Sequence, residues 1–532
     1  MHSTLYKNRT GNHNSGAINK ADASNKSRKW LKDSASNQAG INRRQRRNIL
    51  FVTSEYADLI KAGGLGDVSC ALPKALLALH DIRVLIPGYT AVINSGHAIE
   101  VVAELPAYAK LPKCQLGKMQ IGDGPLIYIL ICPELYERDA TPYTDARGND
   151  WPDNHIRFAR LGLAAAQIAH ATKSLNWLPH VVHANDWPTA LAPAYMKWQG
   201  TQTPCVFTIH NLAHQGLFSP DCMDDLGLPA NAFTLEKMEF YGKLSFMKAG
   251  LVYSNHITTV SKTYAREITL PEHGCGLDGL LKLKYEQGLL SGIVNGIDAS
   301  WQPLSDPHLV ESFGARQWSR KRINTRYVEK LFGLPHTNGP LFAVVSRLAH
   351  QKGLDLTLGV VRTILRAGGR LVVMGTGESR LETELQRLAH QHPYQIGVHI
   401  GFSEAEARRI FAGSDFLLMP SRFEPCGLSQ MYAQSFGSLP IAHGTGGLAD
   451  TIEDGISGFL FHGANVENYR NAVHRALHVF KHPNLLSAMR CRAMLSPRYW
   501  QESVQPYDNL YRSLLKNNNN GKVIFGNWGA ST

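Results

Sequence analysis

Long apolar runs are missing from this 532-residue sequence. No stretch approaches the roughly 18 apolar residues of a membrane-spanning helix, so no transmembrane segment and no membrane partner are expected. The amino terminus also lacks the apolar core that a secretory signal requires. We therefore expect a cytoplasmic protein.

Cysteine patterns typical of metal sites are missing as well. The eight cysteines are scattered, none forms a CxxC pair, and no Cys/His cluster has zinc-site spacing. Such usage is typical of a reducing compartment, where most free cysteines are small buried hydrophobic residues. No metal site is predicted.

Acidic residues are scarce at the amino terminus. Residues 1–48 contain eleven Lys or Arg and two Asp, which accounts for +9 of the chain's net charge of +12. The folded body is therefore close to neutral, and nucleic-acid binding by it is not indicated. We predict that residues 1–47 form a disordered basic tail. Because their composition also resembles a transit peptide, a plastid location is the alternative.

Alternating apolar and helical segments begin at residue 48. The strand candidates of this first series are Asn48–Thr53, Ile82–Ile86, Leu126–Ile131, His180–His183, Cys205–Ile209, Ile257–Val260 and Gly292–Val294. Helical stretches lie between several of them, including Val68–Leu79 and His155–His170. This alternation predicts an α/β domain with a mainly parallel sheet, which we assign to residues 48–298.

A second series follows a polar segment, Asp298–Gly339, which we interpret as a linker. Its strand candidates are Leu341–Val345, Arg370–Met374, Val398–Ile400, Asp415–Met419, Leu439–Ala442 and Gly458–Phe461. We predict a second doubly wound domain over residues 299–499. Two Rossmann-like domains that face each other leave a central cleft at the carboxyl ends of their strands, where ligands of open α/β sheets bind.

Three loops of the first series carry polar or glycine-rich residues. Lys61–Asp67 reads KAGGLGD, in which glycines allow close approach of a ligand and Lys61 can bind a phosphate. Asp186 follows one strand and His210-Asn211 follows another. Each feature alone also fits a chain reversal, a helix cap or a buried histidine.

Loops of the second series combine cations with glycines. Arg347 follows the first strand and Lys352 precedes the next helix, a placement that suits a diphosphate, although two solvated surface charges are the alternative. The segment Ser421–Ser429 follows a strand and contains Glu424, which can accept hydrogen bonds from sugar hydroxyls. We expect Cys426, in the turn before a helix, to have a lowered thiol pKa and unusual reactivity.

The ordered motifs KAGGLGDV, HANDW, TIHNLAHQG, VNGID, AVVSRLAHQKGLDL, PSRFEPCGLSQMYA and GTGGLADT resemble bacterial glycogen synthases and plant starch synthases. The resemblance spans roughly residues 48–515. It implies a glycosyltransferase B fold, a final helix over residues 500–515 that crosses back to the first domain, and a flexible tail at 516–532. It also implies transfer of glucose from ADP-glucose to an α-1,4-glucan such as glycogen, with retention of configuration and without a cofactor.

The resemblance assigns roles to residues at matching motif positions. Those expected to be catalytic are Asp186, His210, Arg347, Lys352 and Glu424. Those expected to bind substrate are Lys61, Gly64, Glu55, Asn211, Asn295, Phe402, Cys426, Gly427, Leu428 and Ser429. Within this set, Arg347 and Lys352 would face the diphosphate, Glu55 and Asn211 the acceptor, and Phe402 the adenine.

Two alternatives stay open at this point. One is a related retaining glucosyltransferase that uses UDP-glucose, because the adenine pocket cannot be read from sequence. The other is a non-catalytic glucan-binding homologue, which would have no need for the phosphate-binding cations. No pair of carboxylates suited to double displacement is evident near the motifs, so front-face attack is the expected mechanism.

Overall fold

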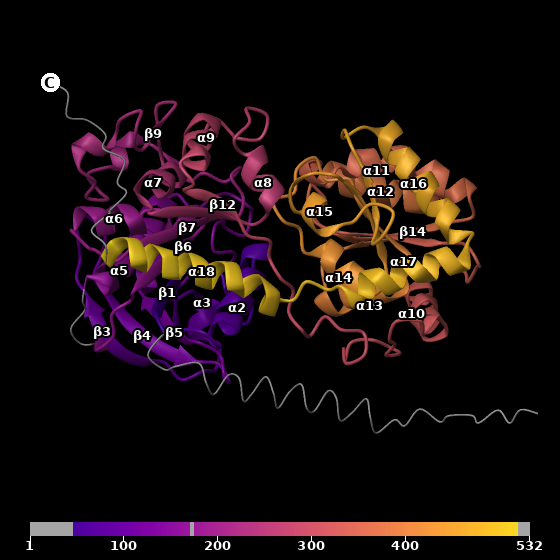
Figure 1. Ribbon diagram of the computed structural model, residues 1–532, viewed down its shortest axis with the longest axis horizontal. Coiled ribbons are helices and arrows are strands. Elements are labelled where there is room, and N and C mark those ends of the chain that lie inside the picture. Colours follow the sequence, from indigo (N-terminus) through magenta and orange to yellow (C-terminus); the bar gives the residue numbers. More distant parts are fainter. Residues whose placement is uncertain (1–45, 171–174, 520–532) are drawn as a thin grey trace, which may run out of the picture. The chain divides into compact units, whose positions relative to one another are not determined.

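The computed structural model describes residues 46–170 and 175–519. From Arg47 on, the chain forms one compact unit that contains two main sheets (Figure 1). The predicted disordered tail, apart from its last two residues, lies outside the described residues. Most of the predicted flexible segment 516–532 lies outside them too, and its first four residues continue the last helix.

The first sheet has nine strands and is parallel except at one edge. Strands β3 and β4 form an antiparallel pair there, and β4 is antiparallel to β5. In spatial order the strands are β12 (Leu290–Gly292), β11 (His256–Thr259), β7 (Cys205–Ile209), β6 (Val181–Asn185), β1 (Asn48–Val52), β2 (Asp81–Pro87), β5 (Leu126–Ile131), β4 (Cys114–Gln120) and β3 (Glu100–Leu105). The chain changes direction across the sheet between β1 and β6.

The second sheet has six parallel strands. In spatial order they are β15 (Ile396–Ile400), β14 (Arg370–Gly375), β13 (Leu341–Val345), β16 (Phe416–Met419), β17 (Leu439–His443) and β18 (Phe459–Phe461). Numbered along the chain, this order is 3-2-1-4-5-6, the Rossmann arrangement with its switch point between the first and fourth strands. The predicted α/β class with two Rossmann-like sheets is therefore confirmed.

Helices pack on both sheets. Those of the first half are α2 (Gly64–Leu76), α3 (Thr90–Ile93), α4 (Pro133–Tyr136), α5 (Asn154–Ala169), α6 (Ala192–Trp198), α7 (Phe246–Tyr253), α8 (Lys262–Glu267) and α9 (Asp278–Glu286). Those of the second half are α10 (Trp318–Leu331), α11 (Leu354–Arg366), α12 (Ser379–Gln391), α13 (Glu404–Gly413), α14 (Ser429–Ser435), α15 (Gly446–Thr451), α16 (Val466–Phe480), α17 (Pro483–Leu495) and α18 (Trp500–Asn519). A small antiparallel sheet joins β8 (Leu217–Phe218), β10 (Lys243–Ser245) and β9 (Glu239–Phe240).

The central strands are apolar because helices cover both of their faces. All five residues of β13, and four of the five in β1, are buried. One apolar cluster surrounds β1, and two surround β13, whose alternate residues Phe342 and Val344 belong to one cluster and Leu341, Ala343 and Val345 to the other. Packing in these cores fixes the positions of the strand ends, from which the loops at the carboxyl edges extend.

Helix α18 belongs to the second half of the chain but packs on the first core. Its buried Trp500, Tyr507 and Tyr511 join the cluster around the first sheet, over which the yellow helix lies in Figure 1. The Tyr511 hydroxyl hydrogen-bonds Nδ1 of His183 in β6 at 2.7 Å. This contact makes the buried His183 a structural residue that anchors the carboxyl-terminal helix.

The interpretation of Asp298–Gly339 as a linker is wrong over its second half. Helix α10 forms there, and its Lys321 is buried. The Lys321 ammonium donates hydrogen bonds to the backbone oxygens of Ala412, at 2.8 Å, and Phe436, at 2.9 Å. Because these carbonyls lie at the ends of α13 and α14, Lys321 provides the hydrogen bonds that helix-terminal carbonyls lack. The polar composition of the segment gave no indication of this structural role.

Two local features of the first half also differ from expectation. Helix α2 begins at Gly64, so half of the predicted glycine-rich turn is the first turn of a helix. The antiparallel strands β3 and β4 are absent from the predicted elements, because Glu100–Leu105 mixes exposed and buried positions as an edge strand does.

Candidate active site

Polar side chains gather at the carboxyl ends of both sheets, next to each switch point. Glu55 follows β1 and Asp186 follows β6, on either side of the first switch point. Arg347 follows β13 and Glu424 follows β16, on either side of the second. Crevices at such points are where open α/β sheets bind ligands.

Glu55 holds the glycine-rich loop in place. It is only 3% exposed, and its Oε2 accepts hydrogen bonds from the amides of Ala62, at 2.7 Å, and Gly63, at 2.8 Å. Its Oε1 accepts a hydrogen bond from the Tyr143 hydroxyl at 2.6 Å. Both carboxylate oxygens are engaged within the chain, so Glu55 orients this loop. Its contact with the acceptor, which the resemblance implies, stays a prediction.

The loop that Glu55 holds carries its own ion pair. Lys61 Nζ lies 2.7 Å from Asp67 Oδ1, and both side chains are about one-third exposed or less. A Cβ added at Gly64 would meet no atom within 4 Å, so the backbone there is open to approach. The predicted phosphate-binding loop is therefore accessible, with its cation held by an aspartate.

Asp186 has an unusual backbone and an unusual environment. Its φ of 59° lies in the left-handed region, and its carboxylate accepts a hydrogen bond from the Trp187 amide at 3.1 Å. Burial raises the pKa of Asp186 to about 8, against the opposing effect of hydrogen bonds from Trp187, Asn211 and His210 backbone groups. At neutral pH this carboxyl is mostly protonated and can donate a hydrogen bond.

His210 is neutral, and its tautomer is fixed by Asn185. Burial lowers the pKa of His210 to about 3. The Asn185 amide nitrogen donates to the carbonyls of Val52 and His183, at 3.0 and 3.2 Å, so its Oδ1 is the atom that faces His210 Nε2 at 3.0 Å. Nε2 must therefore carry the proton, and Nδ1 is left as a hydrogen-bond acceptor.

Lys352 and Glu424 meet at the second switch point. Lys352 Nζ lies 2.5 Å from Glu424 Oε2, which also accepts a hydrogen bond from the Ser421 hydroxyl at 3.0 Å. Gly353 makes this approach possible, because its φ is 68° and an added Cβ would lie 2.1 Å from the Pro420 oxygen. Arg347 is exposed and makes a long contact to Gln351 at 3.4 Å.

The expectation of a reactive Cys426 is wrong. Its side chain is 5% exposed, and burial raises the pKa of the thiol to about 12. An added Cβ at Gly447 would lie 2.2 Å from the Cys426 oxygen, so a second glycine-rich loop closes over this turn. Desolvation thus outweighs any effect of the helix start that follows.

The other predicted residues are placed as follows. Gly427 has a φ of 70° and precedes Leu428 and Ser429 at the start of α14. Asn295 is buried, and its backbone partly offsets the rise in the pKa of the Cys426 thiol. Asn211 accepts a hydrogen bond from the Ala213 amide, and Phe402 is 62% exposed on the loop after β15.

Three residues that contact predicted site residues escaped the sequence reasoning. Asn185 directly precedes Asp186 at the same strand end, and this position could have indicated that it lies at the site. Tyr143 gives no comparable signal, because its contact with Glu55 joins residues 88 positions apart. Ser421 lies in the predicted loop but had no assigned role.

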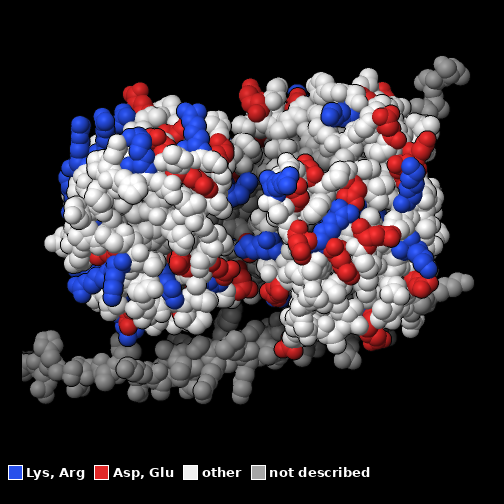
Figure 2. Space-filling model, turned by 180° about the vertical axis from the view of Figure 1, so that it is seen from behind, with Lys and Arg blue, Asp and Glu red and all other residues white. Residues whose placement is uncertain are grey.

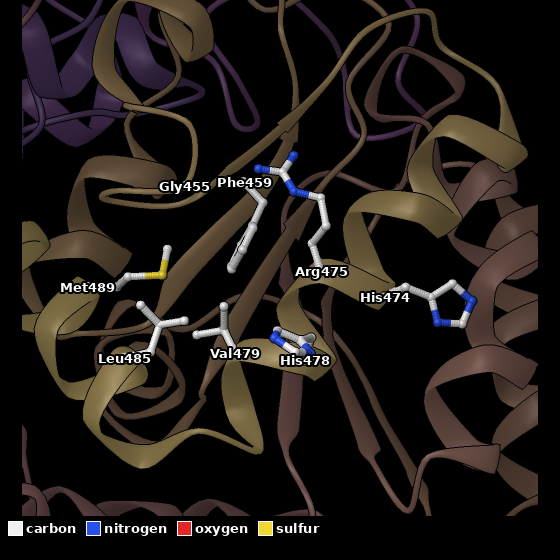
Figure 3. Close-up of a pocket in the computed structure, with 8 residues that line it drawn as sticks. All are labelled: Gly455, Phe459, His474, Arg475, His478, Val479, Leu485 and Met489. Atoms are coloured by element: carbon white, nitrogen blue, oxygen red, sulfur yellow. The ribbon is translucent and has the colours of Figure 1, made fainter.

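One hollow lies away from these residues. A cavity of about 440 Å³ opens between β18, α16 and α17, where Phe459, Arg475, His478 and Met489 surround it (Figure 3). None of the predicted site residues lines it. A second hollow of about 180 Å³ includes Asp67, Leu428 and Tyr432 and so adjoins the predicted site. We place the candidate site next to the second hollow rather than the first, because titratable side chains from both halves of the chain lie around the second.

Membrane-spanning helices and metal-binding clusters are both missing from residues 46–170 and 175–519. No helix in these ranges is long and apolar enough to cross a membrane. No group of three or more His, Cys, Asp or Glu side chains in them has a metal-binding arrangement. Lys/Arg and Asp/Glu side chains are interspersed on the face seen in Figure 2.

The chain is similar to known glucan synthases. Residues 48–283 match the starch synthase catalytic domain family, and residues 330–488 match glycosyl transferases group 1. Glycogen synthase from Pseudomonas syringae pv. tomato is 60% identical over 473 residues, which cover 89% of this chain and 98% of that protein. Glycogen synthase from Pseudomonas aeruginosa is 60% identical over 473 residues, which cover 89% of this chain and 92% of that protein.

Solved structures agree with this relationship. The catalytic domain of starch synthase IV from Arabidopsis thaliana, bound to ADP and acarbose, superposes with a TM-score of 0.77 at 27% identity. The match covers 88% of this chain and 100% of that one. Sucrose-phosphate synthase from Thermosynechococcus elongatus shares the fold, with a TM-score of 0.55 at 15% identity. With 60% identity to curated relatives along most of its length, this chain belongs to the glycogen synthase family of retaining glucosyltransferases.

Proposed function

We propose that the chain transfers glucose from ADP-glucose to the non-reducing end of an α-1,4-glucan such as glycogen. The observation that carries this proposal is the contact between Lys352 and Glu424 at the switch point of the second sheet. It provides a cation for a diphosphate and a carboxylate for sugar hydroxyls at one place. The related starch synthase IV, which was solved with ADP and acarbose, supports an adenine nucleotide and a glucan as ligands.

The charges of the first-domain residues support front-face attack. A double displacement needs an ionised carboxylate as nucleophile. Asp186 is mostly protonated at neutral pH, because burial raises its pKa to about 8, and it is thus a poor nucleophile. We assign Asp186 and the neutral His210 to glucose binding, the first as a donor and the second, through Nδ1, as an acceptor.

In this proposal the leaving diphosphate is stabilised by Lys352 and Arg347. Preorganised cations aimed at a developing anion lower the barrier without reorganisation of solvent. The acceptor 4-hydroxyl enters on the face from which the diphosphate departs, and the departing phosphate oxygen takes its proton. Glu424, released from Lys352 by the incoming diphosphate, then binds glucose hydroxyls. The expected location of this reaction is the cytoplasm.

The test is glucosyl transfer to glycogen from radiolabelled donors. Incorporation from ADP-glucose should exceed that from UDP-glucose, and β-amylase, which cleaves α-1,4 bonds from non-reducing ends, should release the label. Preference for UDP-glucose would reject the donor assignment. Absence of incorporation from either donor, with glycogen still bound, would favour a non-catalytic glucan-binding protein.

A further inference from the structure

Two cysteines lie opposite each other in the first sheet, outside the site described above. The antiparallel register of β4 and β5 pairs Gln115 with Ile131, so the next pair outward is Cys114 with Cys132. Directly opposed residues in such a ladder have Cα atoms about 4.5–5.5 Å apart. A disulfide spans Cα separations of about 4.4–6.8 Å, so this pair can be bridged without movement of the strands.

The two thiols already interact. Each thiol shifts the pKa of the other, and the side chains are 4% and 3% exposed. The Cys132 thiol also contacts Glu134 Oε1 at 3.7 Å, and the Cys114 thiol contacts the Pro112 oxygen at 3.5 Å. The remaining six cysteines are free as well, and among the eight only Cys275 is exposed.

A buried arginine makes the two cysteines unequal. The fully buried Arg160 donates to the carbonyls of Pro112, at 2.7 Å, and Leu105, at 3.3 Å, and to the Gln167 side-chain oxygen, at 3.3 Å. Its positive charge acts on the Cys114 thiol. All three hydrogen-bond partners are neutral, and no carboxylate of the described residues forms an ion pair with Arg160. A buried guanidinium without a carboxylate stabilises a nearby thiolate.

The opposite charge environment surrounds Cys132. Its pKa is raised by its interaction with the Cys114 thiol and by burial, and the Glu134 carboxylate adds to the rise. The pKa of Cys114 is lowered, first by its hydrogen bond with Cys132 and then by Arg160, although burial opposes this. An attacking thiolate beside a protonated resolving thiol is the arrangement found in redox-responsive cysteine pairs.

We infer that Cys114 and Cys132 form a reversible dithiol–disulfide site, with Cys114 as the attacking and Cys132 as the resolving cysteine. The oxidant is a small peroxide, since the buried sulfurs exclude larger reagents. This site is independent of glucosyl transfer.

The chemistry proceeds in two steps. The Cys114 thiolate attacks one oxygen of hydrogen peroxide, the O–O bond breaks, and hydroxide leaves and becomes water on protonation. The Cys132 sulfur then attacks the sulfur of the Cys114 sulfenic acid, and the hydroxyl group leaves with the Cys132 proton as water. One S–S bond forms, two electrons pass from the thiols, and the peroxide is reduced to two waters.

The test is peptide mapping of the full chain after graded hydrogen peroxide treatment. After quenching, unfolding and alkylation, a peptide that joins Cys114 to Cys132 should appear, and dithiothreitol should abolish it. The buried Cys205 serves as the matched control and should stay alkylatable at the same peroxide dose. Oxidation of Cys275 without any Cys114–Cys132 link would overturn the proposal.

Single substitutions test the order of attack. Cys132→Ser should accumulate a Cys114 sulfenic acid that dimedone traps, whereas Cys114→Ser should leave Cys132 unlabelled. The reverse labelling pattern would refute the assigned roles. Circular dichroism checks that each variant is folded, and Cys132→Ala replaces the serine variant if the latter does not fold.

Discussion

Removal of the Lys352 ammonium is the sharpest test of the proposed active site. Lys352 lies 2.5 Å from Glu424 in a pair whose side chains are 18% and 7% exposed, respectively. We expect Lys352→Met to lower kcat by about 100- to 1000-fold. This range corresponds to the roughly 2.7–4 kcal/mol that one preorganised group contributes to a developing anion.

The same substitution has a separate effect on stability. It leaves the Glu424 carboxylate buried without its cation, and an unsatisfied buried group costs about 1–3 kcal/mol. We expect a lower Tm for Lys352→Met. Adding Glu424→Gln removes the buried charge, so the double variant should recover most of the lost Tm while transfer stays low.

Glucosyl transfer from ADP-glucose and differential scanning calorimetry separate the two effects. Lys330→Met, which changes an exposed lysine of α10, is the matched control and should leave both quantities unchanged. A kcat for Lys352→Met within about tenfold of the unmodified enzyme would refute the diphosphate role, since ~1.4 kcal/mol is too little for a leaving-group contact. Recovery of transfer in the double variant would also refute it, because the defect would then come from the unpaired Glu424.

Three further outcomes follow from the structure and the family match. The pKa of Asp186 is about 8 in the folded chain, so its unfavourable contribution to stability grows as pH rises from about 4 to 8. Asp186→Asn should therefore raise Tm, relative to the unmodified protein, by more at pH 8 than at pH 5. An equal gain at both pH values would contradict the assigned burial effect. Because the pKa of Cys426 is raised to about 12 by burial, a thiol reagent should label the exposed Cys275 and spare Cys426 until the chain unfolds. The family match begins at residue 48, so deletion of residues 1–45 should leave kcat and Tm within error, and a large fall in Tm would show that this segment stabilises the body.

Much of the candidate site could be predicted from sequence because its residues directly follow strands. Asp186, His210, Arg347 and Glu424 each follow an apolar run that forms a parallel strand. Parallel topology brings such positions to one edge of a sheet, so local patterns locate them without long-range information. The fold class was predictable for the same reason, since alternation of strands and helices is visible in short windows.

Contacts between distant residues were not predictable. The Lys352–Glu424 pair joins residues 72 positions apart, and the Asn185 amide that fixes the His210 tautomer donates to the Val52 carbonyl, 133 positions away on the neighbouring strand. The error at Cys426 has a physical cause of the same kind. A helix start is a local feature that lowers a thiol pKa, but burial depends on the whole fold and dominates here.

Cation–carboxylate pairs at the proposed phosphate positions have a consequence for substrate binding. Lys61 is paired with Asp67 and Lys352 with Glu424, so a diphosphate must compete with a carboxylate for each ammonium. A diphosphate carries more negative charge than one carboxylate, so we expect the proposed donor to displace Glu424 from Lys352. The displaced Glu424 is then available to accept hydrogen bonds from glucose hydroxyls. In this proposal Glu424 becomes free to bind glucose only when the diphosphate is bound to Lys352. Recognition of the leaving group is thereby coupled to recognition of the transferred glucose.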